Sequence, residues 1–343
     1  MQNRQIEALC QMMAGEDPFL HYPNREAAAL LCQVVQAPTA VPALRQGRFG
    51  KMAGRAPVRE LIGRAGGGVV EPDALAVLAR PDAIWPCSRL GEAAQTIAAA
   101  RPWQWFRRSF AVWHGDRQSW RWRQMSRPGA NLVLQIGFPA DHDAAFYRLF
   151  GRCRRGDFEC PHHPIRTEGA ITMAWARLSL HFKGGRLDAD WEEDLLVEEI
   201  QSDWFGEVDA AAEWMATQAA TDDRLRAGLE RHEHYRRHYL APYRRDWAAA
   251  TLMAVIELAR RELGIKRLWL PQPATGAVLK GITGAQPPVS LYTTLPRRFC
   301  FEPTQDAPRF LEEARIKALR ALRRSKKPLF WRLDLACPGR IDA

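Results

Sequence analysis

The chain has 343 residues, 47% of them hydrophobic, with a formal net charge of +10 at pH 7. This length and composition predict a folded protein of about two structural units with a sizeable core. No apolar run reaches the roughly 18 residues of a membrane-spanning helix, and the N-terminal residues lack the pattern of a signal peptide. We therefore expect a cytoplasmic protein that does not contact membranes.

The cysteines indicate the redox state of the thiols, and the positive charge indicates the kind of partner. Seven cysteines are scattered along the chain in an odd number, which favours reduced thiols over a disulfide framework. Most of the positive charge is arginine, which binds phosphates and stacks on aromatic rings. DNA, RNA or a nucleotide is therefore a plausible polyanionic partner, although arginine-rich composition alone is weak support.

Residues 1–125 read as a mainly helical, basic N-terminal region. Residues 26–36, 73–80 and 90–100 have helical composition. Residues 45–68 differ because they combine many glycines with cations, which is typical of a flexible basic loop. These cations are Arg45, Arg48, Lys51, Arg55, Arg59 and Arg64. The loop lacks the GxxxxGK[ST] pattern of a nucleotide-binding phosphate loop.

Tryptophan and arginine alternate closely in residues 103–127. Such interleaving suits base stacking combined with phosphate pairing. The alternative is that the tryptophans are buried in a core while the arginines lie outside. On the first interpretation, the candidate nucleic-acid or phosphate contacts are Arg107, Arg108, Arg121 and Arg123.

From residue 126 onwards the pattern alternates between strands and helices. It predicts an α/β (α+β) domain with a mixed central sheet over residues 126–306, including a helical insertion at 205–242. A basic helix and an edge strand follow in residues 307–343. The expected strands are 131–138, 171–180, 195–201, 266–270, 298–301 and 329–335, and the expected helices are 141–150, 246–263, 274–282 and 307–324.

The segment 194–204, DLLVEEIQSDW, begins as a buried strand and ends in acidic and amide side chains. In a regular strand Glu199, Gln201 and Asp203 share one face, and Glu198 points to the other. A switch from apolar to polar at the end of a central strand indicates a ligand cleft. The alternative is a strand that simply ends, with Ser202 or Asp203 capping the next helix.

The cluster of Glu199, Gln201 and Asp203 admits three roles. Glu199 can act as a general base on an amine or hydroxyl if burial raises its pKa, while Gln201 and Asp203 position the substrate. The same oxygen atoms can bind Mg²⁺. The third role is structural hydrogen bonding.

Two histidine-rich segments resemble metal sites only weakly. Cys153, Cys160, His162 and His163 contain zinc-binding residue types, but their spacing matches no standard zinc site. His234 and His238 share a helix face at i and i+4, which a solvated basic helix also explains. We therefore assign no metal ligands.

Residues 247–271, followed by 290–301, resemble the second half of a GNAT-type N-acyltransferase. That superfamily has a long helix, a strand, a shorter helix with a tyrosine, and a final strand. The resemblance covers about residues 131–302. It implies that Tyr292 protonates the departing thiolate of coenzyme A and that residues 195–201 form the splayed central strand.

The sequence departs from this superfamily directly after the central strand. The superfamily places there a glycine-containing loop whose amides hold the coenzyme A pyrophosphate. Here Ser202-Asp203-Trp204 and a long insertion follow instead. Arg244 and Arg245 can supply positive charge before the helix 246–263, but they do not reproduce a backbone cradle. The resemblance therefore makes a coenzyme A thioester a weakly supported cofactor.

The string EEIQSDW also resembles a motif in large multidomain proteins of phages and conjugative elements. Together these features predict an acyltransferase-like enzyme that transfers an acyl or related group to an amine. The second hypothesis is a nucleic-acid-binding or mobile-element protein that has a GNAT-like fold without acetyl transfer. The third is an interaction protein whose tryptophans form a partner surface.

Overall fold

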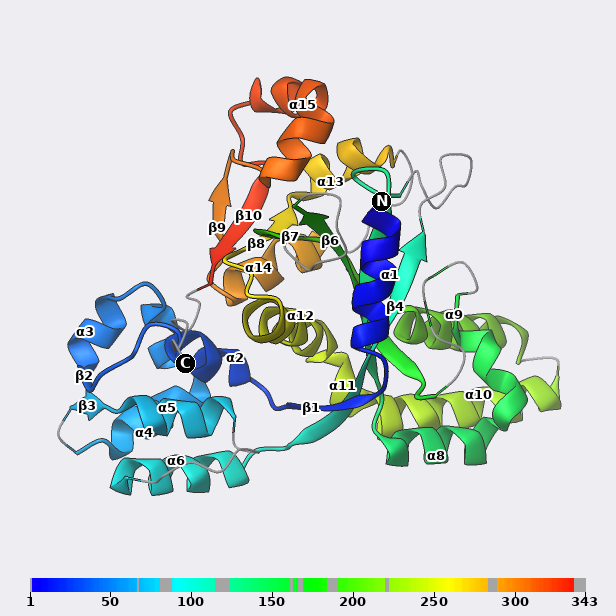
Figure 1. Ribbon diagram of the computed structural model, residues 1–343. Helices are drawn as coiled ribbons and strands as arrows, with labels where there is room; N and C mark the ends of the chain where they lie inside the picture. Colours follow the sequence, from blue (N-terminus) through cyan, green and yellow to red (C-terminus); the bar gives the residue numbers. More distant parts are fainter. Residues whose placement is uncertain are drawn as a thin grey trace.

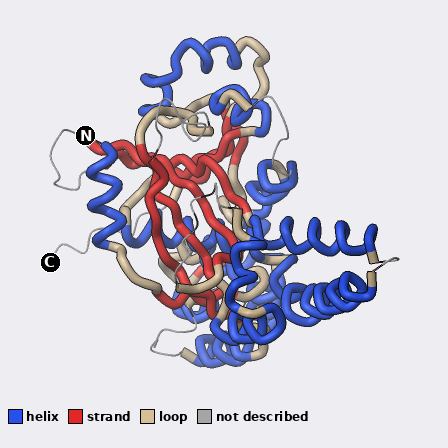
Figure 2. The backbone as a smooth tube through the Cα atoms, turned by 90° about the vertical axis from the view of Figure 1, so that its right-hand side faces the viewer, coloured by secondary structure: helices blue, strands red, loops and turns tan. Residues whose placement is uncertain are grey.

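A large mixed sheet lies at the centre of the protein in a computed structural model, with helices on both sides (Figures 1 and 2). The structure describes residues 2–66, 68–80, 88–114, 124–160, 163, 165, 169–183, 191–219, 222–282 and 289–335. This arrangement confirms the expected mixed α/β class. In the described part of the chain, no helix combines the length and apolar character needed to cross a membrane.

Among the described residues, the central sheet has eight strands in the order β1-β4-β5-β6-β7-β8-β10-β9. Neighbouring strands run antiparallel, except that β7 and β8 are parallel. The strands are β1 (Asp17–His21), β4 (Gln104–His114), β5 (Ala130–Gly137), β6 (Thr172–Phe182), β7 (Trp191–Gln201), β8 (Arg267–Pro271), β9 (Glu302–Thr304) and β10 (Phe330–Asp334). A separate two-stranded sheet joins β2 (Thr39–Ala40) to β3 (Val69–Val70).

Helices cover both faces of the sheet and form a lobe beside it (Figure 1). The α-helices are α1 (Gln2–Met12), α2 (Arg25–Leu31), α3 (Val41–Gln46), α4 (Ala56–Arg64), α5 (Pro72–Ala79), α6 (Arg89–Ala99), α8 (Ala140–Phe150), α9 (Asp203–Gln218), α10 (Asp223–Tyr235), α11 (Ala241–Arg244), α12 (Trp247–Glu257), α13 (Pro273–Lys280), α14 (Thr294–Arg298) and α15 (Arg309–Arg323). Short 3₁₀ segments are η1 (Gly50–Gly54), η2 (Arg152–Phe158) and η5 (Val289–Tyr292), and π-helical segments are η3 (Arg236–Leu240) and η4 (Leu258–Glu262).

The two faces of the sheet bury separate cores. Helix α12 is apolar along most of its length and packs on β5, β6 and β7, where Leu195 and Val197 belong to its core. On the opposite face, Leu196 packs with Trp269 and with α15 residues such as Phe310. Burial on both faces explains why β5 is entirely buried and reads as a continuous apolar run.

Strand β7 does not alternate regularly. Val197 pairs with Leu178 and Glu199 pairs with Arg177, so Glu198 is an extra residue in a β-bulge. The bulge shifts the alternation, because Val197 and Ile200 both join the core beneath α12. Regular alternation places Glu199 on the same face as Val197. Because of the bulge, Glu199 lies on the other face.

The sheet extends beyond the segment expected to contain it. Strands β1 and β4 come from within residues 1–125, so the sheet begins before the expected boundary at residue 126. The strand expected at the C-terminal edge, β10, instead lies between β8 and β9. That expectation was wrong because β9 forms the outer neighbour. β9 begins at Glu302, and the strand expected at 298–301 is instead the end of α14 and the turn that follows it.

The N-terminal lobe of α2 to α6 is attached to α12 through one buried arginine. Arg25 donates hydrogen bonds to the carbonyl oxygens of Leu20 and Ala79, and its Nη2 lies 2.7 Å from Oε1 of Glu257. The neighbouring Tyr22 hydroxyl donates to the carbonyl oxygen of Leu78 at 2.6 Å. The lobe therefore depends on polar contacts with the main sheet as well as on its own core.

A buried polar chain joins α9 and α10 to α8. The Trp204 indole donates to the Tyr235 hydroxyl at 2.8 Å, and that hydroxyl lies 2.9 Å from Nε2 of His142. Since the Tyr235 oxygen accepts from Trp204, its proton is directed to His142. His142 then carries its own proton on Nδ1, facing Asp143 at 3.2 Å. Burial lowers the pKa of His142.

We expect stability to fall on acidification because of such histidines. Burial also lowers the pKa of His21 and His232, so all three stay neutral in the folded chain at a pH where the unfolded chain binds protons. The stabilisation is complete above about pH 6.5 and is lost as the pH falls from there towards the folded-state pKa. Urea midpoints measured between about pH 7.5 and about pH 5.5 should therefore decrease.

His142→Gln should reduce this pH dependence, because it removes one of the buried histidines. An unchanged pH dependence in His142→Gln would contradict the assignment.

Candidate functional site

The parallel strands β7 and β8 diverge after a short paired segment. Their pairing joins Asp194, Leu195 and Leu196 to Arg267, Leu268 and Trp269. Strand β7 then continues to Gln201, and β8 ends at Pro271. We call the space between the diverging ends the β7–β8 fork. Beyond Leu196, no strand among the described residues pairs with β7 on that side, so the polar backbone groups of β7 need other partners.

Lys280 fills part of the fork from the last turn of α13. Its Nζ donates a hydrogen bond to the carbonyl oxygen of Glu198 and lies 3.9 Å from Oε2 of Glu199. Burial lowers the pKa of Lys280, while Glu199 opposes that shift. Gly281, with a φ of 65°, ends α13 directly after this lysine.

Tyr292 reaches the fork from the other side. Its carbonyl oxygen accepts a hydrogen bond from the Trp331 indole at 2.7 Å, which fixes the residue beside β10. The hydroxyl is buried and has no hydrogen bond of good geometry with any described residue, although it lies close enough to the Ile200 backbone to interact weakly with it. Burial, followed by the charge of Glu199, raises the pKa of Tyr292, so the hydroxyl keeps its proton.

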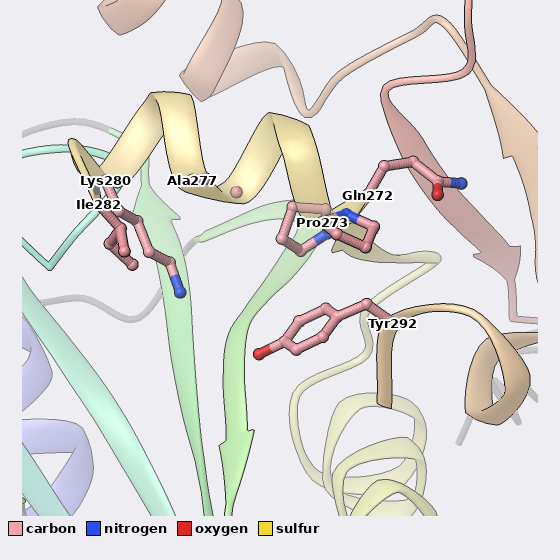
Figure 3. A pocket seen from close by; sticks show the side chains of 8 residues that line it. Gln272, Pro273, Ala277, Lys280, Ile282 and Tyr292 are labelled. Atoms are coloured by element: carbon pink, nitrogen blue, oxygen red, sulfur yellow. The ribbon is translucent and has the colours of Figure 1, made fainter. Parts of the chain in front are cut away.

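A small hollow with a water-accessible volume of about 20 Å³ lies between these two side chains. Figure 3 shows the Lys280 amine and the Tyr292 hydroxyl pointing towards the strands from opposite sides of it. The remaining wall comes from β8 and α13. The lining residues are Pro271, Gln272, Pro273, Gly276, Ala277, Lys280, Ile282 and Tyr292.

Glu199 forms a buried ion pair rather than standing free. Its Oε2 lies 2.7 Å from Nη2 of Arg177 on β6, and the same nitrogen donates to the carbonyl oxygen of Gln124 at 2.7 Å. The guanidinium also lies over the Trp113 ring, 5.4 Å from its centroid. Only 1% of the Arg177 side chain is exposed, so Glu199 supplies the negative charge that this cation requires.

Glu198 is bound by the same loop that accepts a hydrogen bond from Arg177, the partner of Glu199. The Ser126 hydroxyl donates to its Oε1, and burial lowers the pKa of the nearby Arg127 to about 10, although the Glu198 charge opposes that shift. Gln124 and Ser126 both precede β5, so one loop contacts both carboxylate systems. The bulge in β7 thus brings together two glutamates that regular alternation separates.

Asp203, the first residue of α9, organises a second cluster one turn beyond the fork. Its Oδ1 lies 2.8 Å from Nδ1 of His163 and accepts from the Gln201 amide at 2.6 Å. Its Oδ2 accepts from the Trp175 indole at 3.2 Å. Because Asp203 accepts from Nδ1, the neutral His163 ring has Nε2 available as a proton acceptor.

The other candidate residues take varied positions. Arg244 binds both carboxylate oxygens of Asp209 at 2.6 Å, and Arg245 is exposed before α12. Arg107 pairs with Asp143, and Arg108 pairs with Glu262 and Asp17. Arg121 and Arg123 lie outside the described residues. Arg107, Arg108 and Arg244 therefore already have carboxylate partners.

The sequence offered three places where a metal ion could bind: the cluster of Glu199, Gln201 and Asp203, and the two histidine-rich segments. Across the described ranges, no group of three or more His, Cys, Asp or Glu side chains is arranged to hold a metal ion. His162 and the side chain of Cys153 lie outside the described residues. His163 contacts Asp203 and Gln201 instead of a zinc-type cluster.

Comparison with known proteins gives no assignment. No family model, curated protein or solved structure matches the chain.

Sequence patterns did not assign three residues to this site: Arg177 and Lys280 were not singled out, and His163 was named only among the zinc-binding residue types. His163 lies 40 positions before Asp203, and Arg177 lies 22 positions before Glu199, so only the sheet and its loops join them. Lys280 stood inside an expected helix, with no local sign that its amine would be buried. Arg177 carried one signal, since a cation in an otherwise apolar strand needs a nearby negative charge.

Replacing Arg177 with Met should strongly destabilise the fold. The change leaves Glu199 buried without its main partner, which costs about 3 kcal/mol or more of unfolding free energy. Urea unfolding at neutral pH measures this loss. The double variant Arg177→Met with Glu199→Gln should recover part of it, because no unpaired carboxylate remains.

The exposed pair of Lys266 and Glu193 provides the control. Lys266→Met should change stability by less than about 1 kcal/mol. Equal losses in Arg177→Met and Lys266→Met would refute the special role of the buried pair.

Proposed function

We propose that this chain is an acyltransferase-like enzyme that transfers an acyl or related group to an amine at the β7–β8 fork. The observation that carries the proposal is the Tyr292 hydroxyl, which is buried at the fork, protonated, and without a good hydrogen bond to any described residue. A buried donor without a partner costs free energy, and a ligand oxygen or sulfur at that position offsets the cost.

The succession of elements around the fork supports the likeness to GNAT-type N-acyltransferases. The long helix α12 precedes β8, and Tyr292 follows α13 before the short strand β9. Strand β7 separates from β8 after three paired residues, as the splayed central strand of that superfamily does. These features favour an acyl donor that enters between the strands as an extended chain.

The residues present do not fit the pyrophosphate of coenzyme A at the start of α9. The Asp203 carboxylate occupies that helix start and accepts three hydrogen bonds, so an anion there meets a negative charge. Arg244 is already bound to Asp209. We therefore define the donor only as a molecule with an activated acyl carbonyl.

The transfer moves two protons, one from the amine and one to the leaving atom, and the site has one side chain for each. The amine nitrogen attacks the acyl carbonyl, and Nε2 of His163 takes the proton that the amine loses. Asp203 holds the ring through Nδ1, and Gln201 donates to the same Asp203 oxygen. As the bond from the carbonyl carbon to the leaving atom breaks, the Tyr292 hydroxyl donates to that atom. Glu199, the base expected from the sequence, instead holds Arg177 in this scheme.

Lys280 has to move for the donor to enter. Its amine donates a hydrogen bond to the Glu198 carbonyl oxygen. An extended donor lying along β7 needs that oxygen as its own hydrogen-bond acceptor. The lysine therefore closes the fork in the absence of donor. Its position in the last turn of α13 allows the side chain to swing without moving the strand.

An acyl-transfer screen tests the proposal. Purified protein is mixed with acyl thioesters and acyl phosphates and with a panel of amines, and products are measured by mass spectrometry. We expect His163→Asn and Tyr292→Phe each to lower kcat/KM by about a hundredfold or more. Tyr239→Phe, at a half-buried tyrosine outside the fork, is the control and should retain activity.

The same assay compares the two proton acceptors. Loss of activity in Glu199→Gln but not in His163→Asn would return the base role to Glu199. No transfer with any donor, or full activity in Tyr292→Phe, would remove the proposed function.

A further inference from the structure

A basic hollow opens between the N-terminal lobe and the strands β9 and β10. It has a volume of about 1080 Å³, including the part open to solvent. One wall is the segment 45–51, from the end of α3 to the start of η1, and the other is the segment 297–303 together with Trp331. Figure 1 shows the lobe that carries α3 lying beside α14 and the lower end of β9 and β10.

The lining of this hollow is strongly cationic. Arg45, Arg48, Lys51 and Arg297 contribute four positive charges, and Glu302 contributes one negative charge, which leaves +3. Arg48 lies 3.7 Å from the partly exposed Asp334. In the described part of the chain, no carboxylate lies within ion-pair distance of the other three cations. Their mutual repulsion is therefore relieved by solvent or by a bound anion.

The first wall is tightly anchored rather than loose. Leu44, Phe49 and Met52 are buried, and the Gly50 amide donates to the Gly47 carbonyl oxygen at 2.9 Å. A Cβ added to Gly50 would lie 1.9 Å from the carbonyl oxygen of Arg45, so only glycine fits this turn. The turn therefore presents its cations from a fixed backbone, which lowers the entropy cost of binding an anion.

The second wall is equally well defined. Phe299 and Phe301 are buried on either side of Cys300, which adopts a left-handed φ of 58°. The Arg297 guanidinium lies over the Trp331 ring, 5.4 Å from its centroid. This stacking holds one planar, bidentate donor at the hollow, and such donors suit phosphate oxygens.

We propose that the basic hollow binds the phosphate groups of a small anionic ligand, such as a nucleotide. Its water-accessible volume of about 570 Å³ matches the clefts that hold small molecules, and two anchored walls face each other across it. An extended nucleic acid requires a continuous basic track, but Arg107 and Arg108 are already paired with carboxylates. The proposal concerns binding only and does not depend on acyl transfer at the fork.

Isothermal titration with adenosine 3′,5′-bisphosphate and with inorganic pyrophosphate tests this site on the full chain. Both should bind, adenosine without phosphate should not, and added salt should weaken the binding. The paired variant Lys51→Gln with Arg297→Gln should weaken binding about tenfold or more, because it removes one cation from each wall.

The matched control is Lys317→Gln with Arg320→Gln on α15, which removes the same charge from exposed positions outside the hollow. It should leave binding unchanged. Absence of binding to either phosphate compound, or equal weakening in both paired variants, would overturn the proposal. So would selective binding of a single-stranded oligonucleotide with no affinity for either small compound, because that result assigns the cations to nucleic acid.

Discussion

The divergence of β7 from β8 is the constraint on which the rest of the structure depends. A central strand that loses its neighbour still has buried backbone groups, and each of these requires a partner. Lys280 takes the Glu198 carbonyl oxygen, and Tyr292 approaches the Ile200 backbone. Because both side chains come from segments after β8, the fork is closed by the C-terminal part of the chain. The gap between β7 and β8 is therefore lined by the side chains of Lys280 and Tyr292.

The charges at the fork follow from a second constraint, which is that buried ions need compensation. Arg177 is nearly inaccessible and lies between Glu199, the Gln124 carbonyl oxygen and the Trp113 ring. Glu198 is satisfied by Ser126, whose loop also carries Gln124. The loop that carries Gln124 and Ser126 therefore contacts both the Arg177–Glu199 ion pair and Glu198. This coupling joins the segment before β5 to the end of β7.

Local patterns gave a good account of the elements and a partial account of the site. The apolar run of β5 and the amphipathic stretch of α15 correspond to buried or packed elements, because burial shapes composition. The polar end of β7 indicated where side chains able to bind a ligand or transfer a proton gather. Alternation failed within β7, since the bulge at Glu198 leaves no mark in a string of alternating residues. The same limit hid the interior position of β10, because strand order depends on contacts between distant segments.

The sequence by itself determined the mixed α/β class, the candidate strand end and the basic character of residues 45–51. These properties reside in residue types and their spacing, which a chain carries before it folds. Only the tertiary structure decided which of them act together. It placed His163 against Asp203, buried Lys280 beneath the carbonyl oxygen of Glu198, and set Arg297 opposite the basic turn. The physical reason is that hydrogen bonds, ion pairs and shared hollows depend on distance in space, and the sheet sets those distances.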